Sequence, residues 1–137
     1  MNPILKKMAY KYQDPLLILN APTEFTNVIK DIEASVHTKE SAQYGFIIIF
    51  SDKIAEAKTL IERAFNHMTQ DCVIWLCYPK MLSKKYKSEF NREKFWEFFL
   101  PYGYESVTQV SIDNDWSALR FKKSSKVKNR GGEKPVK

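Results

Sequence analysis

The chain has 137 residues, a length typical of one domain that buries a core without disulfides or bound metal. Its two cysteines, Cys72 and Cys77, lie too far apart along one apolar run to bridge each other, and neither a signal-type segment nor a run of 18 apolar residues is present. These features argue against a disulfide-rich secreted domain and a membrane span, and they predict a cytoplasmic location.

The net charge of +6 is concentrated at the C-terminus. Residues 1–121 hold fifteen basic and fifteen acidic residues, whereas residues 122–137 hold seven basic residues and one acidic residue. We therefore predict one α/β domain over 1–122 and a disordered basic tail over 123–137. Such a tail either makes weak, salt-sensitive contact with nucleic acid or only keeps the chain soluble.

The N-terminal third predicts a strand, a tight loop and a helix. Asp14-Pro15 is a turn signal, and the apolar run LLILN that follows predicts a strand over 15–20 that is covered on both faces. Asn20 can cap the next helix, whose apolar residues recur at helical spacing, namely Phe25, Val28, Ile29 and Ile32. A short alternating segment over 34–38 predicts a weaker strand at the edge of the sheet.

Two further strands are more strongly marked. YGFIIIF predicts a strand over 44–50, after which Ser51-Asp52 can cap a helix over about 52–68. The run over 72–79 also predicts a strand, and both of its faces are apolar or aromatic, because Val73, Trp75 and Cys77 alternate with Ile74, Leu76 and Tyr78. Strands buried on both faces are typical of parallel sheets flanked by helices.

The C-terminal part predicts an aromatic helix and a hairpin. After a basic loop over 81–88, a helix over 91–100 carries an aromatic stripe that forms either a core face or a homodimer surface, made of Phe95, Phe98 and Phe99 with Trp96 at one side. SVTQVSI and WSALRFK then flank the turn-rich Asp113-Asn114-Asp115 and predict two antiparallel strands.

This element order resembles the Rossmann-like fold of the S-adenosylmethionine-dependent methyltransferases, with one helix missing before YGFIIIF. LLILNAP, the Trp75 to Lys80 segment WLCYPK, the Asn91-Arg92 helix start and DNDWSALRF also resemble a family of small bacterial proteins of unknown function, over roughly residues 5–122. The resemblance implies a Rossmann-like three-layer sandwich whose mostly parallel sheet ends in an antiparallel β-hairpin. It implies no activity.

Several chemistries lack their residues. A methyltransferase or dinucleotide site needs glycines after the first strand, but this loop reads Asn20-Ala21-Pro22-Thr23, and Glu40 is the nearest acidic candidate for a ribose contact. His37 and His67 match no metal-binding spacing, and no serine lies in a G-x-S-x-G motif. We therefore predict no cofactor, no metal and no catalytic residue, and we favour a binding protein over an enzyme.

Ligands of open α/β sheets bind beyond the carboxyl ends of the parallel strands. The residues expected at these ends, together with one hairpin aromatic, form our candidate crevice: Asn20, Pro22, Ser51, Asp52, Lys80 and Trp116. The leading hypothesis is a binding module for a small anionic ligand or a protein partner. The alternatives are a divergent methyltransferase-like transferase with a rebuilt cofactor loop, and a nucleic-acid-associated protein that uses its basic tail.

Overall fold

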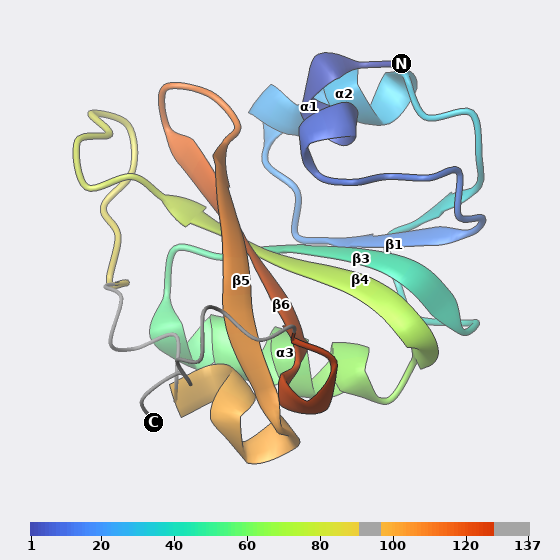
Figure 1. The fold of residues 1–137 in the computed structure, drawn as a ribbon. Helices are drawn as coiled ribbons and strands as arrows, with labels where there is room; N and C mark the ends of the chain where they lie inside the picture. Colours follow the sequence, from blue (N-terminus) through green and yellow to red (C-terminus); the bar gives the residue numbers. More distant parts are fainter. Residues whose placement is uncertain (91–96, 128–137) are drawn as a thin grey trace.

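The computed structural model describes residues 1–90 and 97–127, and it contains a six-stranded sheet with helical layers on both sides (Figure 1). The strand order is β2-β1-β3-β4-β6-β5. The strands are β1 (Leu16–Leu19), β2 (Val36–His37), β3 (Tyr44–Phe50), β4 (Met68–Pro79), β5 (Tyr104–Ser111) and β6 (Trp116–Lys123). The helical elements are α1 (Pro3–Lys7), η1 (Thr23–Phe25), α2 (Thr26–Lys30), α3 (Ile54–Phe65), η2 (Leu100–Tyr102) and η3 (Ser124–Lys126).

The sheet is mixed, as the sequence predicts. β2, β1, β3 and β4 run parallel, with Ile48 opposite Ile18 on one side and Trp75 on the other. β6 then pairs with β4 antiparallel, and β5 closes the sheet as the outer strand of the hairpin. The predicted Rossmann-like α/β class with a final antiparallel hairpin is therefore confirmed.

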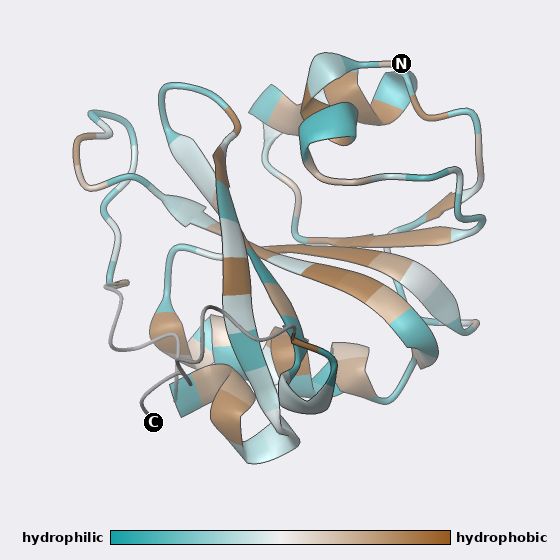
Figure 2. Cartoon of the chain, in the orientation of Figure 1, coloured by the Kyte–Doolittle hydropathy of each residue, from teal (hydrophilic) through white to brown (hydrophobic). Residues whose placement is uncertain are grey.

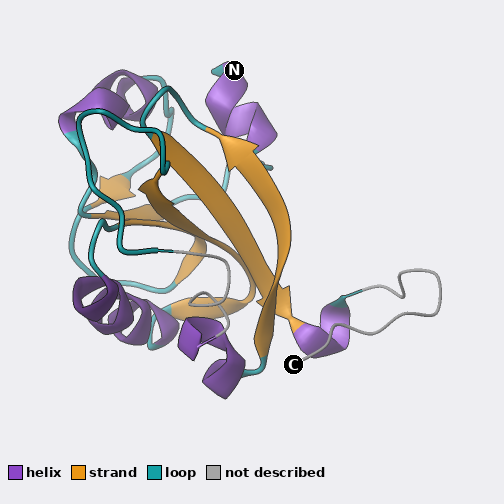
Figure 3. Ribbon diagram, turned by 90° about the vertical axis from the view of Figure 1, so that its left-hand side faces the viewer, coloured by secondary structure: helices purple, strands orange, loops and turns teal. Residues whose placement is uncertain are grey.

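Alternation along the central strands sends apolar side chains to two cores. Leu17, Ile47 and Ile49 pack with α3 on one face, and Ile18 and Ile48 pack with α1, α2 and Trp75 on the other. Figure 2 shows the hydrophobic colouring gathered on these central strands, and Figure 3 shows the strands between helices on two sides. The strands are apolar at nearly every position because both faces are covered.

Several boundaries differ from the sequence prediction. α1 was not predicted. The backbone carbonyl of Met8, the C-cap residue of α1, accepts a hydrogen bond from Trp75 Nε1 at 2.9 Å. The single helix expected after the first strand is split into η1 and α2. β4 begins at Met68 instead of residue 72. Its first residues are mostly polar and exposed, so the apolar pattern that marks the rest of the strand does not include them. No helix interrupts the described connection between β2 and β3, as expected.

The aromatic helix is only partly described. Residues 97–99 are helical and continue into η2, whereas 91–96, with Phe95 and Trp96, lie outside the described residues. Phe98 and Phe99 are buried, and Phe99 stacks on Phe121 with the ring centroids 3.5 Å apart. These two residues belong to the core face, and the homodimer remains a prediction.

The folded part continues past the predicted boundary at residue 122. Lys123 completes β6, and the amide of Ser124 donates to the carbonyl of Gly103 at 2.8 Å. Lys126 Nζ forms an ion pair with Asp71 at 2.8 Å. Two of the six basic residues of the predicted tail, Lys123 and Lys126, therefore belong to described structure.

Candidate functional site

The point where the strand order reverses lies between β1 and β3. The chain leaves β1 toward β2 on one side and then crosses back to β3 on the other, so the carboxyl ends of β1 and β3 are neighbours at one edge of the sheet. In open α/β sheets this is where ligands bind. The candidate site is therefore built on the residues that follow these two strands.

Asn20 and Ser51 meet at this edge through Glu56. The Asn20 backbone has a φ of 62°, and its Nδ2 donates to the carbonyl of Phe50 at 2.9 Å and to Glu56 Oε1 at 3.1 Å. The hydroxyl of Ser51, which is fully buried, lies 2.7 Å from the same carboxylate oxygen and 2.9 Å from the carbonyl of Lys53. These contacts tie the end of β1 to β3 and to the first turn of α3.

A cavity of about 470 Å³ opens beside this bridge, a size that suits a small ligand. Its lining comes from the ends of β1 and β2 and from one side of α3, and consists of Leu19, Asn20, Thr38, Lys39, Glu56, Thr59, Leu60 and Arg63. The lining is mostly polar, with hydroxyl, amide, carboxylate and cationic groups around two leucines.

One side of the cavity is held by an ion pair between α3 and the segment after β2. Arg63 Nε donates to Glu40 Oε2 at 2.8 Å. This hydrogen bond from Arg63 is the main reason why the pKa of Glu40 falls from 4.5 to about 2, and the same bond raises the pKa of Arg63. Lys39, in contrast, forms no ion pair with another described residue.

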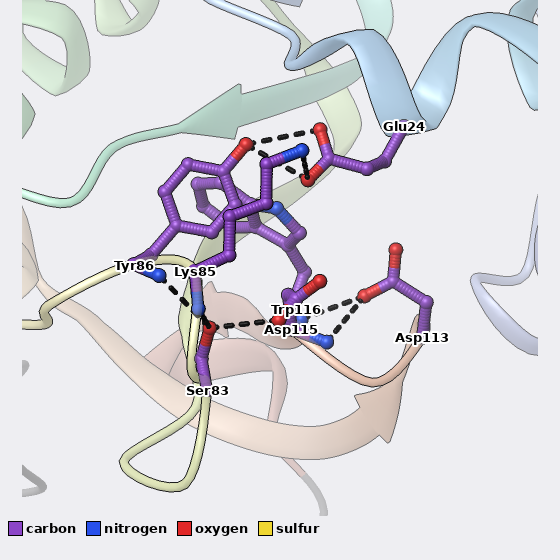
Figure 4. A network of polar contacts seen from close by, with 7 residues as sticks. All are labelled: Glu24, Ser83, Lys85, Tyr86, Asp113, Asp115 and Trp116. Carbon is purple, nitrogen blue, oxygen red and sulfur yellow. Dashed lines mark hydrogen bonds and ion pairs between the residues drawn. The ribbon is translucent and has the colours of Figure 1, made fainter.

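The other side of the strand-end edge is closed by the chain itself (Figure 4). The hydroxyl of Tyr86, from the loop after β4, lies 2.8 and 3.0 Å from the carboxylate oxygens of Glu24, and Lys85 Nζ lies 3.1 Å from the same carboxylate. Burial favours the neutral form of Glu24, but the hydrogen bonds from Tyr86 and Lys85 outweigh it, and the net effect lowers the pKa of Glu24.

The β5–β6 turn completes this closed side. Ser83 Oγ donates to Asp115 Oδ1 at 2.8 Å, and Asp113 Oδ1 accepts from the amides of Asp115 and Trp116, each at 2.8 Å. Trp116 is buried, with its ring 5.3 Å from Phe50 and 4.9 Å from Tyr86 between centroids. Trp116 therefore packs in the core beneath the loop, and Asp113 shapes the hairpin turn.

The six candidate residues do not form one group. Among them, Asn20 alone lines the cavity, and Ser51 reaches it through Glu56. Lys80 lies apart, at the end of β4, where its Nζ donates to Ser111 Oγ at 2.6 Å. Pro22 precedes η1, and Asp52 forms no hydrogen bond with another described residue.

Sequence reasoning missed most of the cavity lining. Glu56, Thr59 and Arg63 are spaced i, i+3 and i+7 and so share one face of α3, which is the signal that could have identified them. Thr38 and Lys39 carried no such signal. They line the cavity because they directly follow β2, which pairs with β1 at this side of the sheet.

Nucleophilic and metal chemistry have little support in the described residues. Burial raises the pKa of the Cys72 thiol to about 12 and also raises the pKa of the Cys77 thiol, so the reactive thiolate is scarce at neutral pH. No group of three or more side chains there could hold a metal ion. Nor does any helix in residues 1–90 or 97–127 have the length and apolar character needed to cross a membrane.

Comparison with protein-family models and with curated proteins finds no match to the sequence. Solved structures do match. An S-adenosylmethionine-dependent methyltransferase from Clostridium acetobutylicum is 6% identical with a TM-score of 0.53, over 86% of this chain and 87% of that one. The N-methyltransferase NodS from Bradyrhizobium japonicum is 9% identical with a TM-score of 0.53, over 86% and 90%. A functionally unknown protein from Deinococcus radiodurans is 8% identical with a TM-score of 0.51, over 88% and 84%.

The chain has a methyltransferase-like fold. Identities this low establish the fold and leave the activity to the site. After β1 this chain carries Asn20 in place of a glycine-rich turn, and the Asn20 side-chain amide donates to the carbonyl of Phe50 at 2.9 Å. Glu40, the nearest carboxylate after β2, is already paired with Arg63.

Proposed function

We propose that the protein is a binding module that holds a small anionic ligand in the cavity beside β1, β2 and α3. The lining carboxylate of Glu56 is engaged by Asn20 and Ser51, and Arg63 is engaged by Glu40. Lys39 is the lining cation left to attract an anion, and Thr38 and Thr59 offer hydroxyl groups beside it. A hollow of this size favours a small molecule over a protein surface.

The arrangement of Asn20 carries this proposal. A residue with a left-handed backbone at this turn is commonly glycine, because glycine adopts positive φ at little cost and leaves room for a ligand. Here the side chain of Asn20 occupies that place and braces β1 against β3 and α3. The strand end is therefore stiffened, and the space for a ligand is displaced toward Lys39 and α3.

Native mass spectrometry of the purified full chain tests the proposal. We expect a ligand that co-purifies with the wild-type chain and is lost from Thr59→Trp, because Thr59 is exposed on α3 and an indole there fills the cavity mouth. Glu62→Trp, also exposed on α3 but outside the lining, is the matched control and should keep the ligand. Equal retention by both variants, or no bound mass in the wild type, would contradict the proposal.

The alternative is a divergent methyltransferase, favoured by the likeness of the fold to the solved methyltransferases. We expect no saturable binding of S-adenosylmethionine in isothermal titration calorimetry at micromolar concentrations, because the Asn20 side chain blocks the close approach that the cofactor needs. Saturable heat in that range would favour the transferase over the binding module.

A further inference from the structure

A second cavity, of about 320 Å³, lies at the end of the sheet opposite the proposed ligand site. It forms where the first residues of β4 extend beyond their pairing with β6, which begins at Ile74 opposite Phe121. The lining is drawn from β4, β5, β6 and η3, and consists of Gln70, Asp71, Cys72, Tyr104, Arg120, Lys122, Lys123 and Lys126.

The lining is strongly basic. It contains four cations and one carboxylate, that of Asp71, which is taken up by Lys126 at 2.8 Å. The side chains of Arg120, Lys122 and Lys123 form no ion pair with another described residue. Glu105 is opposite Lys122 in the register of the hairpin but does not line the cavity.

Arg120 shows that this cavity is more than a group of surface lysines. Its Nε is buried and has no hydrogen-bond partner among the described residues. Desolvation lowers the pKa of the guanidinium, which means that the charged form is held in an unfavourable environment. An anion beside it would satisfy the buried donor and offset the cost of burying the charge.

We propose that this cavity binds phosphate groups of a nucleic-acid backbone. Guanidinium and ammonium groups are the donors that phosphate oxygens prefer in proteins, and Arg120 supplies the planar fork while Lys122 and Lys123 supply point charges. The inference is independent of the proposed small-ligand site, which uses other residues at the other end of the sheet.

A nucleic acid is favoured over a free phosphorylated molecule because positive charge continues along the chain. Directly after the last described residue, Val127, the sequence contains four basic residues and one acidic residue, namely Lys128, Arg130, Lys134, Lys137 and Glu133. A polyanion gains from cations spread over many residues, because each neutralised phosphate releases a condensed counterion. A small phosphorylated molecule would gain binding energy only from the cations that line the cavity.

The test is fluorescence anisotropy with the full chain and a labelled oligothymidylate of about 12 nucleotides, a length within the usual site size of single-strand-binding domains. We expect Lys122→Ala combined with Lys123→Ala to weaken binding by about tenfold or more at low salt. The plot of log affinity against log salt should also become shallower by about 1.4, at about 0.7 for each lost phosphate contact.

The matched control is Lys6→Ala combined with Lys7→Ala, which removes the same charge from the exposed face of α1. It should stay within about twofold of the wild type if binding is local to the cavity, since distant exposed charges are screened. An equal loss in both double variants would overturn the proposal, because only net charge would then matter.

Two further measurements can overturn it. If the cavity variant binds like the wild type and deletion of residues 128–137 abolishes binding, the contact lies in the tail and not in the cavity. If inorganic pyrophosphate displaces the oligonucleotide at an equal phosphate concentration, the ligand is a small phosphorylated molecule. Arg120→Lys, which keeps the charge but loses the planar fork, should weaken binding while leaving the thermal midpoint close to that of the wild type.

Discussion

At the scale of single residues, Asn20 links the elements that meet at the strand-end edge. Its backbone adopts the left-handed conformation that glycine would adopt, and asparagine is one of the few other residues that do so readily. Unlike glycine, it brings an amide that donates to two acceptors on neighbouring elements. One residue thus adopts the positive φ of this turn and also ties the end of β1 to β3 and α3.

Trp75 and Lys80, five residues apart in the chain, should respond differently to truncation. Trp75 is fully buried and its indole donates to Met8, so Trp75→Ala should lower the free energy of unfolding by about 3–5 kcal/mol through the cavity it leaves. Lys80 forms one polar contact at the rim, and Lys80→Ala should cost less than about 1 kcal/mol. Urea denaturation of both variants measures the contrast, and a loss above 3 kcal/mol for Lys80→Ala would show that it is structurally required.

Glu40 should make stability depend on pH in the acid range. Its pKa is lowered in the folded state, so the stabilisation is fully present above about pH 4.5 and is lost as the pH falls toward 2. The pair with Arg63 is partly exposed to solvent, which limits the effect to about 1 kcal/mol. Glu40→Gln should flatten the difference in unfolding free energy between pH 5 and pH 2.5, relative to the wild type. A variant that follows the wild-type curve would place the acid sensitivity elsewhere.

At the scale of elements, the loop after β4 acts as a cover over one side of the strand ends. Glu24 from η1 and Asp115 from the hairpin both bond to this loop, through Tyr86 and Ser83. Its tip remains bare, with Met81 and Leu82 about nine-tenths exposed. The two sides of the edge therefore differ, since one is closed by this loop and the other opens into the cavity along α3.

Removing the Tyr86 hydroxyl should loosen the cover without unfolding the domain. In Tyr86→Phe the ring can still pack on Trp116, but the hydrogen bonds to Glu24 are lost, at a cost of about 1–2 kcal/mol. Limited proteolysis should then cleave faster after Lys84 or Lys85 than in the wild type. Tyr12→Phe, at an exposed tyrosine far from the loop, is the control. Unchanged cleavage would mean that the loop is held by its other contacts.

At the scale of the whole molecule, the charge is divided between a neutral body and a basic end. Residues 1–121 are balanced, and the excess begins at the last strand, where three lysines join the folded part. The two cavities lie at opposite ends of the sheet, one beside the strand ends and one beside the basic segment. A ligand at one need not compete with a ligand at the other.

Deletion of residues 128–137 should leave the thermal midpoint within about two degrees of the wild type. The segment holds one valine among charged and small residues, so it offers little apolar surface to bury. Truncation after Lys123 is the comparison, because it also removes Lys126 and its ion pair with Asp71. Differential scanning calorimetry of both truncations measures this. A midpoint several degrees lower for the shorter deletion would mean that these ten residues stabilise the fold.

The sequence alone determined the order of the strands along the chain and the class of the fold. Runs such as YGFIIIF and VIWLCY are apolar on both faces, and that property is local and easily recognised. It also placed Asn20 at the end of the first strand with no glycine after it, but it was wrong to make Asn20 a helix cap, because the N-cap residues of η1 and α2 are Pro22 and Phe25. It could not separate η1 from α2 or predict α1, because short helices depend on the packing beneath them more than on their own propensity.

Only the tertiary structure decided which polar residues meet. Glu56, Arg63 and Lys39 reach one cavity from separate elements, and Arg120, Lys123 and Lys126 reach the other. Most of them looked like ordinary surface charges in the sequence, since charged residues usually face solvent and carry no period that marks a site. The strand order and the path of the loops set their distances, and these follow from long-range packing that no single segment encodes.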